Sequence, residues 1–214
     1  MNVTVTAYKW VPPQVQGWVR DFRVRWACEE AGIAYKTKLV DFPEAKSEDY
    51  RAHWQPFGQV PGAEIDGLAL FESGAIVLAI AEKNETLLPA DPAQRLRAIT
   101  WLFAALNSVE VPVQEYGMLM FYKDQPWTKE REPQLAEWIR ARYRQLSDAL
   151  GGKQYLEGDH FTIGDLMMFS VLRIIADSDF LAAEPNLVAY YNRIEARPAF
   201  KKAIAAQMAD FEKR

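Results

Sequence analysis

The sequence predicts a protein of two parts, a mixed α/β region followed by an all-α region. Residues 1 to about 82 combine short, β-branched runs with helical patterns. From about residue 93 onward, long segments keep the helical spacing of apolar residues. The chain has 214 residues, about one and a half times a typical domain, so one or two domains are expected.

Four strands and two main helices are expected in the first region. Val3 to Tyr8 alternates and is rich in β-branched residues, and Gly32 ends the first helical pattern. Asp66-Gly67 is a tight-turn signal between two apolar runs. The expected strands are 3–8, 35–40, 60–65 and 68–71, and the expected helices are 18–31 and 73–82, with one helical turn around 48–52.

The second region is expected to be wholly helical and to follow a linker. The predicted division is a first domain of residues 1–82, a linker of residues 83–92 and a helical domain of residues 93–214. A bend is expected near Pro112 because proline interrupts a helix. The expected helices are 93–121, 129–150, 161–175, 187–196 and 198–212.

Composition argues against several classes of partner. The chain has 25 Lys and Arg against 29 Asp and Glu, a formal net charge of -4. A nucleic acid or an anionic membrane needs a cationic excess that this chain lacks. No stretch approaches the ~18 uninterrupted apolar residues of a membrane span. We therefore expect no nucleic acid, no membrane and a cytoplasmic location.

The cysteine and histidine content argues against disulfides and a structural zinc site. Cys28 is the single cysteine, so it has no internal disulfide partner. With only His53 and His160 beside it, the chain does not supply four Cys/His ligands, and we expect no metal.

The segment from Gly58 to Ile76, GQVPGAEIDGLALFESGAI, resembles the glutathione-binding segment of the glutathione transferase superfamily. It combines a G-x-V-P turn with a Glu-Ser pair eleven residues after the proline, where a helix opens. Further similar stretches follow the family order along nearly the whole chain: 24–33, 161–165, 185–187 and 197–198. The resemblance implies a thioredoxin-like first domain, a helical second domain, a homodimer and a role in detoxification.

The same resemblance implies how glutathione would bind. Pro61 would follow a cis peptide bond, and Val60 would offer its backbone N–H and C=O to the cysteinyl part of glutathione. Taken alone, the Val-Pro pair would favour a plain loop proline at the start of a strand. Ser73 suits the γ-glutamyl carboxylate at a helix N-terminus, and Glu72 suits the ammonium. Ser73 also fits a simple helix cap, and both roles are compatible.

Two contacts of glutathione are less sharply predicted. Gln59 is a candidate contact through its amide. The glycine carboxylate needs a cation or an indole N–H, and Lys46, His53 and Trp54 all lie in the relevant stretch without a preference among them.

Tyr8 is the candidate catalytic residue. The family uses a Tyr, Ser or Cys near the end of the first strand or the start of the first helix, and residues 9–27 contain no Ser, Thr, Cys or Tyr. A phenol at Tyr8 would donate its O–H to the glutathione thiolate; the alternative is an ordinary strand residue. Other sources of thiolate stabilisation are a backbone N–H of the first helix, or positive charge from Arg20 or Arg23.

Two further features are assigned to folding. Cys28 lies late in the first helix, among Trp26, Ala27 and two glutamates, and a core thiol is the favoured interpretation. Thr162 with Asp165 three residues later resembles a capping box, with Asp in place of the usual Glu.

The sequence therefore predicts an enzyme that conjugates glutathione, as co-substrate, to a small hydrophobic electrophile. The alternative is a protein that binds glutathione or apolar ligands without turnover, because a fold does not fix a function. A third hypothesis is glutathione-dependent isomerisation or dehalogenation.

Overall fold

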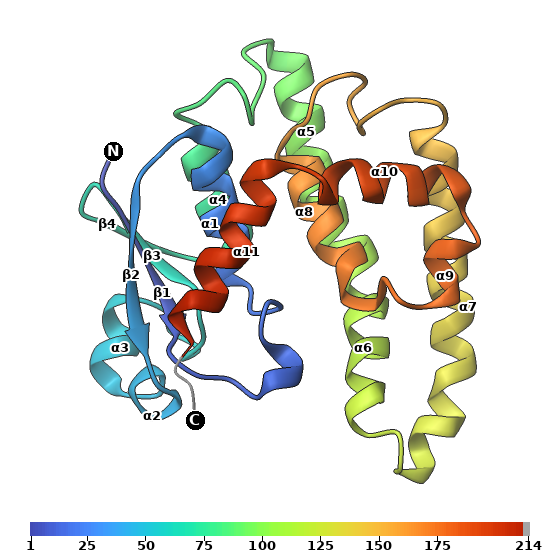
Figure 1. The fold of residues 1–214 in the computed structure, drawn as a ribbon, viewed down its shortest axis with the longest axis horizontal. Coiled ribbons are helices and arrows are strands. Elements are labelled where there is room, and N and C mark those ends of the chain that lie inside the picture. Colours follow the sequence, from blue (N-terminus) through green and yellow to red (C-terminus); the bar gives the residue numbers. More distant parts are fainter. Residues whose placement is uncertain (212–214) are drawn as a thin grey trace. The chain divides into compact units, whose positions relative to one another are not determined.

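The computed structural model describes residues 1–211, and they form two compact units. Residues Met1–Leu87 and 196–211 make the first unit, and Leu88–Glu195 make the second (Figure 1). The first is α/β and the second is helical, as the fold class predicted from sequence requires. The domain division at residues 82 and 93 stays a prediction, and Glu212, the predicted end of the last helix, lies outside the described residues.

A mixed four-stranded sheet forms the centre of the first unit, with the strand order β2-β1-β3-β4. The strands are β1 Val3–Tyr8, β2 Tyr35–Val40, β3 Gly62–Ile65 and β4 Leu68–Phe71. β2 is parallel to β1, whereas β3 is antiparallel to both β1 and β4. A parallel pair needs a crossover, and helix α1 (Asp21–Ala31) supplies it. The third strand begins two residues later than predicted, after the proline.

The helices of the first unit are α1, α2 (Phe42–Ala45), α3 (Glu48–His53), α4 (Ser73–Ala81) and α11 (Pro198–Asp210), with a 3₁₀ turn at Pro13–Val15. α1 begins three residues later than predicted. Its C-terminal cap is Gly32, in the left-handed conformation with φ 66° that glycine adopts readily. Both α4 and α11 pack against α1, which explains why its residues from Asp21 to Cys28 are buried (Figure 1).

Ion pairs and hydrogen bonds connect α11 to α1. The buried Arg25 pairs with Asp21 at 2.8 Å in its own helix and with Asp210 of α11 at 2.7 Å. Gln207 donates from Nε2 to Asp21 Oδ1 at 2.7 Å. The last helix of the chain is therefore part of the core of the first unit.

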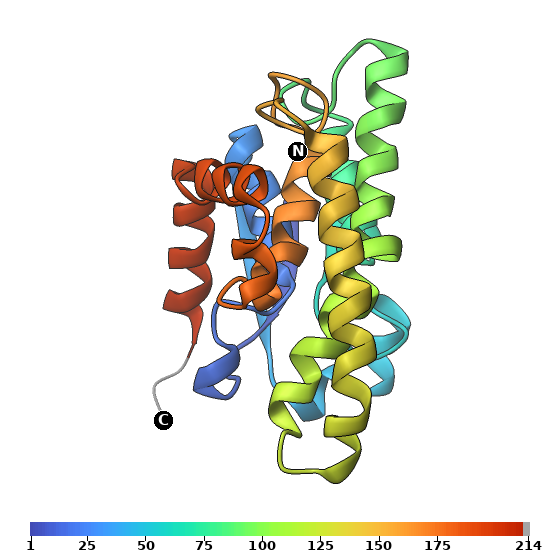
Figure 2. The same cartoon turned by 90° about the vertical axis from the view of Figure 1, so that its right-hand side faces the viewer.

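The second unit is helical throughout its regular structure. Its elements are α5 (Pro92–Ala104), a π-helical segment (Ala105–Val109), α6 (Glu110–Phe121), α7 (Pro126–Leu150), α8 (Ile163–Leu172), a 3₁₀ turn (Arg173–Ile175), α9 (Asp179–Ala182) and α10 (Pro185–Glu195). Figure 2 shows α6 and α7 side by side, and every residue of α8 is buried. The single helix predicted over residues 93–121 is divided by the π-helical segment into α5 and α6, and Pro112 is the third residue of α6. The bend near Pro112 stays a prediction.

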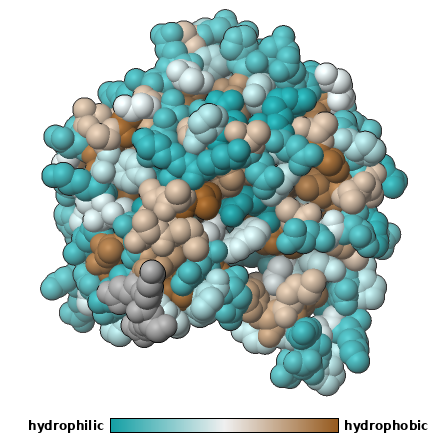
Figure 3. Space-filling view, in the orientation of Figure 1, coloured by the Kyte–Doolittle hydropathy of each residue, from teal (hydrophilic) through white to brown (hydrophobic). Residues whose placement is uncertain are grey.

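The surface is largely hydrophilic on the face that Figure 3 shows, with apolar residues in scattered groups. Several large apolar side chains are nevertheless exposed, among them Leu96 and Phe57. Within residues 1–211, no helix has the length and apolar character needed to cross a membrane.

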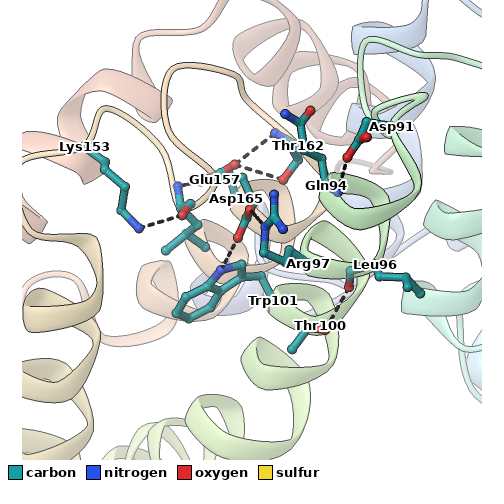
Figure 4. Close-up of polar contacts among 11 residues, drawn as sticks. Asp91, Gln94, Leu96, Arg97, Thr100, Trp101, Lys153, Glu157, Thr162 and Asp165 are labelled. Atoms are coloured by element: carbon teal, nitrogen blue, oxygen red, sulfur yellow. Dashed lines mark hydrogen bonds and ion pairs between the residues drawn. The ribbon is translucent and has the colours of Figure 1, made fainter.

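The predicted capping box at the start of α8 is confirmed. Asp165 accepts from the backbone N–H of Thr162 at 2.9 Å, while the Thr162 side chain caps the helix (Figure 4). The same buried carboxylate also accepts from the backbone N–H of Leu156 at 2.9 Å and from the Tyr190 hydroxyl at 3.0 Å. We call these groups the Asp165 network.

Close packing of α8 on α5 surrounds this network. A Cβ on Gly164 would lie 2.6 Å from Trp101 Cβ, so only glycine fits this contact. Glu157 accepts from Trp101 Nε1 at 2.9 Å and from Arg97 Nε at 2.7 Å (Figure 4). The loop before α8 is thereby joined to α5.

Candidate functional site

The strand register brings three candidate segments to one end of the sheet. Val5 is opposite Ala63 in the antiparallel β1–β3 pair, so the end of β1 lies beside the start of β3. Gly62 is opposite Phe71 in the β3–β4 pair, so the start of β3 lies beside the end of β4. Tyr8, Val60-Pro61 and Glu72-Ser73 are attached to these three strand ends and therefore share one edge.

The peptide bond between Val60 and Pro61 is cis, as the resemblance implies. Val60 is half-buried and packs against a small core cluster of Val40, Ala45 and Tyr50. The residue after the proline has no freedom to vary, because a Cβ on Gly62 would lie 2.5 Å from the Trp54 carbonyl oxygen.

Two buried hydroxyls bond to the backbone on either side of this peptide. The Tyr50 hydroxyl donates to the Gln59 carbonyl at 2.8 Å, just before Val60. The backbone N–H of Gly62, just after Pro61, donates to Thr6 Oγ1 at 2.8 Å. The two hydroxyls lie 2.7 Å apart, so they join the two flanks. Burial raises the pKa of Tyr50 to about 12, which keeps this hydroxyl protonated as a donor.

Gln55 organises the rest of the loop before the proline. Its buried amide oxygen accepts from the backbone N–H of Phe57 at 2.6 Å and from that of Gln59 at 3.4 Å. Its amide nitrogen donates to Gln59 Oε1 at 3.4 Å, and the Gln59 side chain itself is exposed. The candidate Gln59 thus lies beside Val60 on a loop shaped by a residue that sequence reasoning missed.

Ser73 is buried and is the first residue of α4, where Glu72 takes the cap position. The sequence predicted Ser73 as the cap; its hydroxyl instead accepts from the buried Arg23 Nη1 at 3.3 Å. Glu72 is exposed and its side chain makes no capping hydrogen bond to the first N–H groups of α4. A helix N-terminus in this state attracts an anion.

Glu72 has an unusual backbone. Its φ of 68° and ψ of 117° lie in a region that residues other than glycine rarely adopt. Such conformations cost about 1–3 kcal/mol and cluster at functional sites. This backbone conformation of Glu72 connects the end of β4 to the start of α4.

Tyr8 ends β1 and is half-buried. Its ring packs on Phe42, with the ring centroids 4.5 Å apart, and it contacts the same core cluster as Val60. Burial raises the pKa of Tyr8, so its phenol stays neutral and able to donate. The structure brings Tyr8 and Val60 together on one cluster, and Ser73 together with Arg23.

The open candidates for the glycine carboxylate have other contacts. Lys46 Nζ donates to the Phe57 carbonyl at 3.5 Å, and His53 Nε2 lies 3.3 Å from Glu64 Oε2. Trp54 packs against the cluster that holds Val60. The geometry does not single out one of the three.

Cys28 is buried in the core of the first unit. Burial raises the pKa of the Cys28 thiol to about 12, so it is a core residue and not a nucleophile. Among the residues that the structure describes, no group of three or more His, Cys, Asp or Glu is placed to hold a metal ion.

Comparisons with known proteins agree on one family. The family model "Glutathione S-transferase, N-terminal domain" matches residues 5–82, and "Glutathione S-transferase, C-terminal domain" matches residues 113–207. Glutathione S-transferase F11 of Arabidopsis thaliana is 31% identical over 160 residues, covering 69% of this chain and 74% of that protein. Glutathione S-transferase GstA of Escherichia coli O157:H7 is 27% identical over 186 residues, covering 83% and 89%.

Solved structures share the fold. Poplar glutathione transferase F1 superposes with a TM-score of 0.84 at 20% identity, covering 98% of this chain and 99% of that one. A glutathione transferase family member from Pseudomonas fluorescens pf-5, solved with two glutathione bound, has a TM-score of 0.80 at 23% identity, covering 94% and 92%.

Proposed function

Because the chain belongs to the glutathione S-transferase family, we propose that it conjugates glutathione to a small hydrophobic electrophile. The observation that carries the proposal is the convergence of cis Val60-Pro61 and Glu72-Ser73 at one end of the sheet. The first supplies backbone hydrogen-bonding groups and the second an anion-binding helix N-terminus. Glutathione, an extended peptide with a charged γ-glutamyl end, needs both.

Each group takes one part of the co-substrate. Val60 pairs with the cysteinyl backbone by strand addition, in which main-chain groups provide the recognition. Ser73 and the first N–H groups of α4 receive the γ-glutamyl carboxylate, and Glu72 receives the ammonium. The exposed Gln59 amide adjoins this path.

Tyr8 activates the sulfur. A free thiol has a pKa of about 8.5, so a donor that stabilises the thiolate raises the reactive fraction at neutral pH. The neutral phenol of Tyr8 donates its O–H to the sulfur. The thiol proton is released to water, and the resulting thiolate attacks the electrophilic carbon; a C–S bond forms, and the leaving group departs with its electron pair. Holding both substrates side by side supplies much of the acceleration.

The turnover of chloro-dinitrobenzene tests this mechanism. Tyr8→Phe is expected to lower kcat about 10- to 100-fold, because one transition-state donor is lost. Tyr35→Phe is the matched control: Tyr35 is a half-buried tyrosine of the adjacent strand, opposite Val3 and so at the other end of β1. Full activity in Tyr8→Phe would remove Tyr8 from the mechanism.

A second function is favoured by one observation. Residues 9 to 27 contain no Ser, Thr, Cys or Tyr, so the segment that follows β1 supplies no hydroxyl or thiol in place of Tyr8. Glutathione binding without turnover of any electrophile would identify a ligand-binding protein on this fold.

We also propose that the protein is a homodimer and acts in cytoplasmic detoxification. Analytical ultracentrifugation at micromolar concentration tests the dimer.

A further inference from the structure

Four groups around the cis peptide form one directed chain of hydrogen bonds. The Gly62 N–H donates to Thr6 Oγ1 at 2.8 Å, and the Tyr50 hydroxyl donates to the Gln59 carbonyl at 2.8 Å. Each hydroxyl has a single proton, and that of Tyr50 is already directed to Gln59. The 2.7 Å contact between the hydroxyls is therefore a donation from Thr6 to Tyr50. A contact from Thr6 to the Gly62 carbonyl is longer, at 3.3 Å.

The chain of hydrogen bonds is shielded from water. Thr6 is fully buried and Tyr50 is 3% exposed. Water does not replace a buried hydroxyl that is removed, so its partners are left unsatisfied. The positions of Gln59 and Gly62 therefore depend on two side chains from β1 and α3.

The residue between these flanks keeps its backbone groups for another partner. Among residues 1–211, Val60 makes no backbone–backbone hydrogen bond, while both of its flanks are held. Pro61 has no N–H to offer. Backbone groups without a partner inside the protein are the groups that an extended ligand pairs with.

We propose that Thr6 and Tyr50 are positioning residues for glutathione, which hold the backbone on both sides of cis Val60-Pro61 so that Val60 meets the cysteinyl part of the ligand. The inference rests on the proposed function and adds two residues that do not touch the ligand. Burial raises the pKa of Tyr50 to about 12, so the direction of the hydrogen bonds is constant through neutral pH.

Three variants test the role of the hydroxyls. Tyr50→Phe and Thr6→Val remove one oxygen each and keep the packing volume, whereas Thr6→Ser keeps the hydroxyl. We expect Tyr50→Phe and Thr6→Val to raise the glutathione Kd and KM about tenfold, the effect of one well-placed hydrogen bond, with the KM for the electrophile unchanged. Thr6→Ser should recover most of the affinity.

Tyr190→Phe is the matched control for a general loss of stability. Tyr190 is also buried and also donates its hydroxyl to a buried acceptor, Asp165, but in the second unit. It should lower the melting temperature and leave the glutathione Kd as in the wild type. A Tyr50→Phe protein that binds glutathione as the wild type does, or a Thr6→Ser protein as weak as Thr6→Val, overturns the inference. A wild-type protein that binds no glutathione overturns the proposed function, and this inference with it.

Discussion

Buried hydrogen bonds have different roles in the Asp165 network of the second unit and in the Thr6–Tyr50 pair of the first unit. Asp165 receives bonds from two backbone N–H groups and a tyrosine hydroxyl, and it begins a helix that is buried along its whole length. Thr6 and Tyr50 are neutral and hold a loop that carries the exposed Gln59 and the half-buried Val60. Buried hydrogen bonds thus stabilise a core in one unit and shape the proposed binding edge in the other.

The two differ in how many buried groups depend on them. Asp165 accepts from two backbone N–H groups and the Tyr190 hydroxyl, so losing its carboxyl group leaves several buried donors unpaired. The neutral pair holds only the flanks of one peptide bond. We therefore expect substitutions in the first network to act on stability, and those around the second to act on glutathione binding.

Asp165→Ala should have the largest effect on stability. It leaves the N–H groups of Leu156 and Thr162 and the hydroxyl of Tyr190 without their acceptor, at a cost above about 3 kcal/mol in the free energy of unfolding. Urea denaturation measures this loss. A change below about 1 kcal/mol would show that the network is not what stabilises the start of α8.

High pH should weaken both networks together. Burial raises the pKa of Tyr50 to about 12 and that of Tyr190 well above its usual value of 10. Above about pH 10 the unfolded chain releases tyrosine protons that the folded chain keeps, so the free energy of unfolding falls as the pH rises. Below that pH these tyrosines add no pH dependence. Stability that stays constant from pH 9 to 11.5 would contradict these shifts.

Glu72→Gly should separate stability from binding. Glycine adopts φ 68° without strain, so the melting temperature should not fall, although the side chain is lost. The glutathione Kd should rise about tenfold because the carboxylate that meets the ammonium is gone. Calorimetry and thermal denaturation on the same sample measure both. Unchanged affinity would remove Glu72 from the site.

The sequence predictions that the structure confirms rest on local sequence patterns. The Thr162–Asp165 box spans three residues and its geometry follows from helix capping alone. The order of strands and helices followed from periodicity and turn residues, with ends shifted by a few residues. The roles given to Tyr8, Gln59, Val60, Pro61, Glu72 and Ser73 remain predictions, although the structure places their segments at one edge.

Contacts between residues far apart in the sequence could not be predicted from it. Thr6 meets Tyr50 across 44 positions, and Arg23 meets Ser73 across 50. A buried tyrosine in a polar, irregular stretch carries no spacing signal that points to a strand residue so far away. The sequence indicates Arg23 only as a source of positive charge, because its hydrogen bond to Ser73 depends on the packing of α1 against α4. The packing of α11 against α1 is another contact between distant segments that the sequence does not predict.

Titration calorimetry of glutathione against the wild-type protein, Ser73→Ala and Ser170→Ala tests the central claim most directly. Ser170 is a buried serine of α8 whose hydroxyl donates within its own helix, which makes it a matched control. The account predicts binding to the wild type, the same affinity in Ser170→Ala and an affinity at least about tenfold weaker in Ser73→Ala. No binding to the wild type, or equal binding in Ser73→Ala, would contradict a glutathione site at this edge of the sheet.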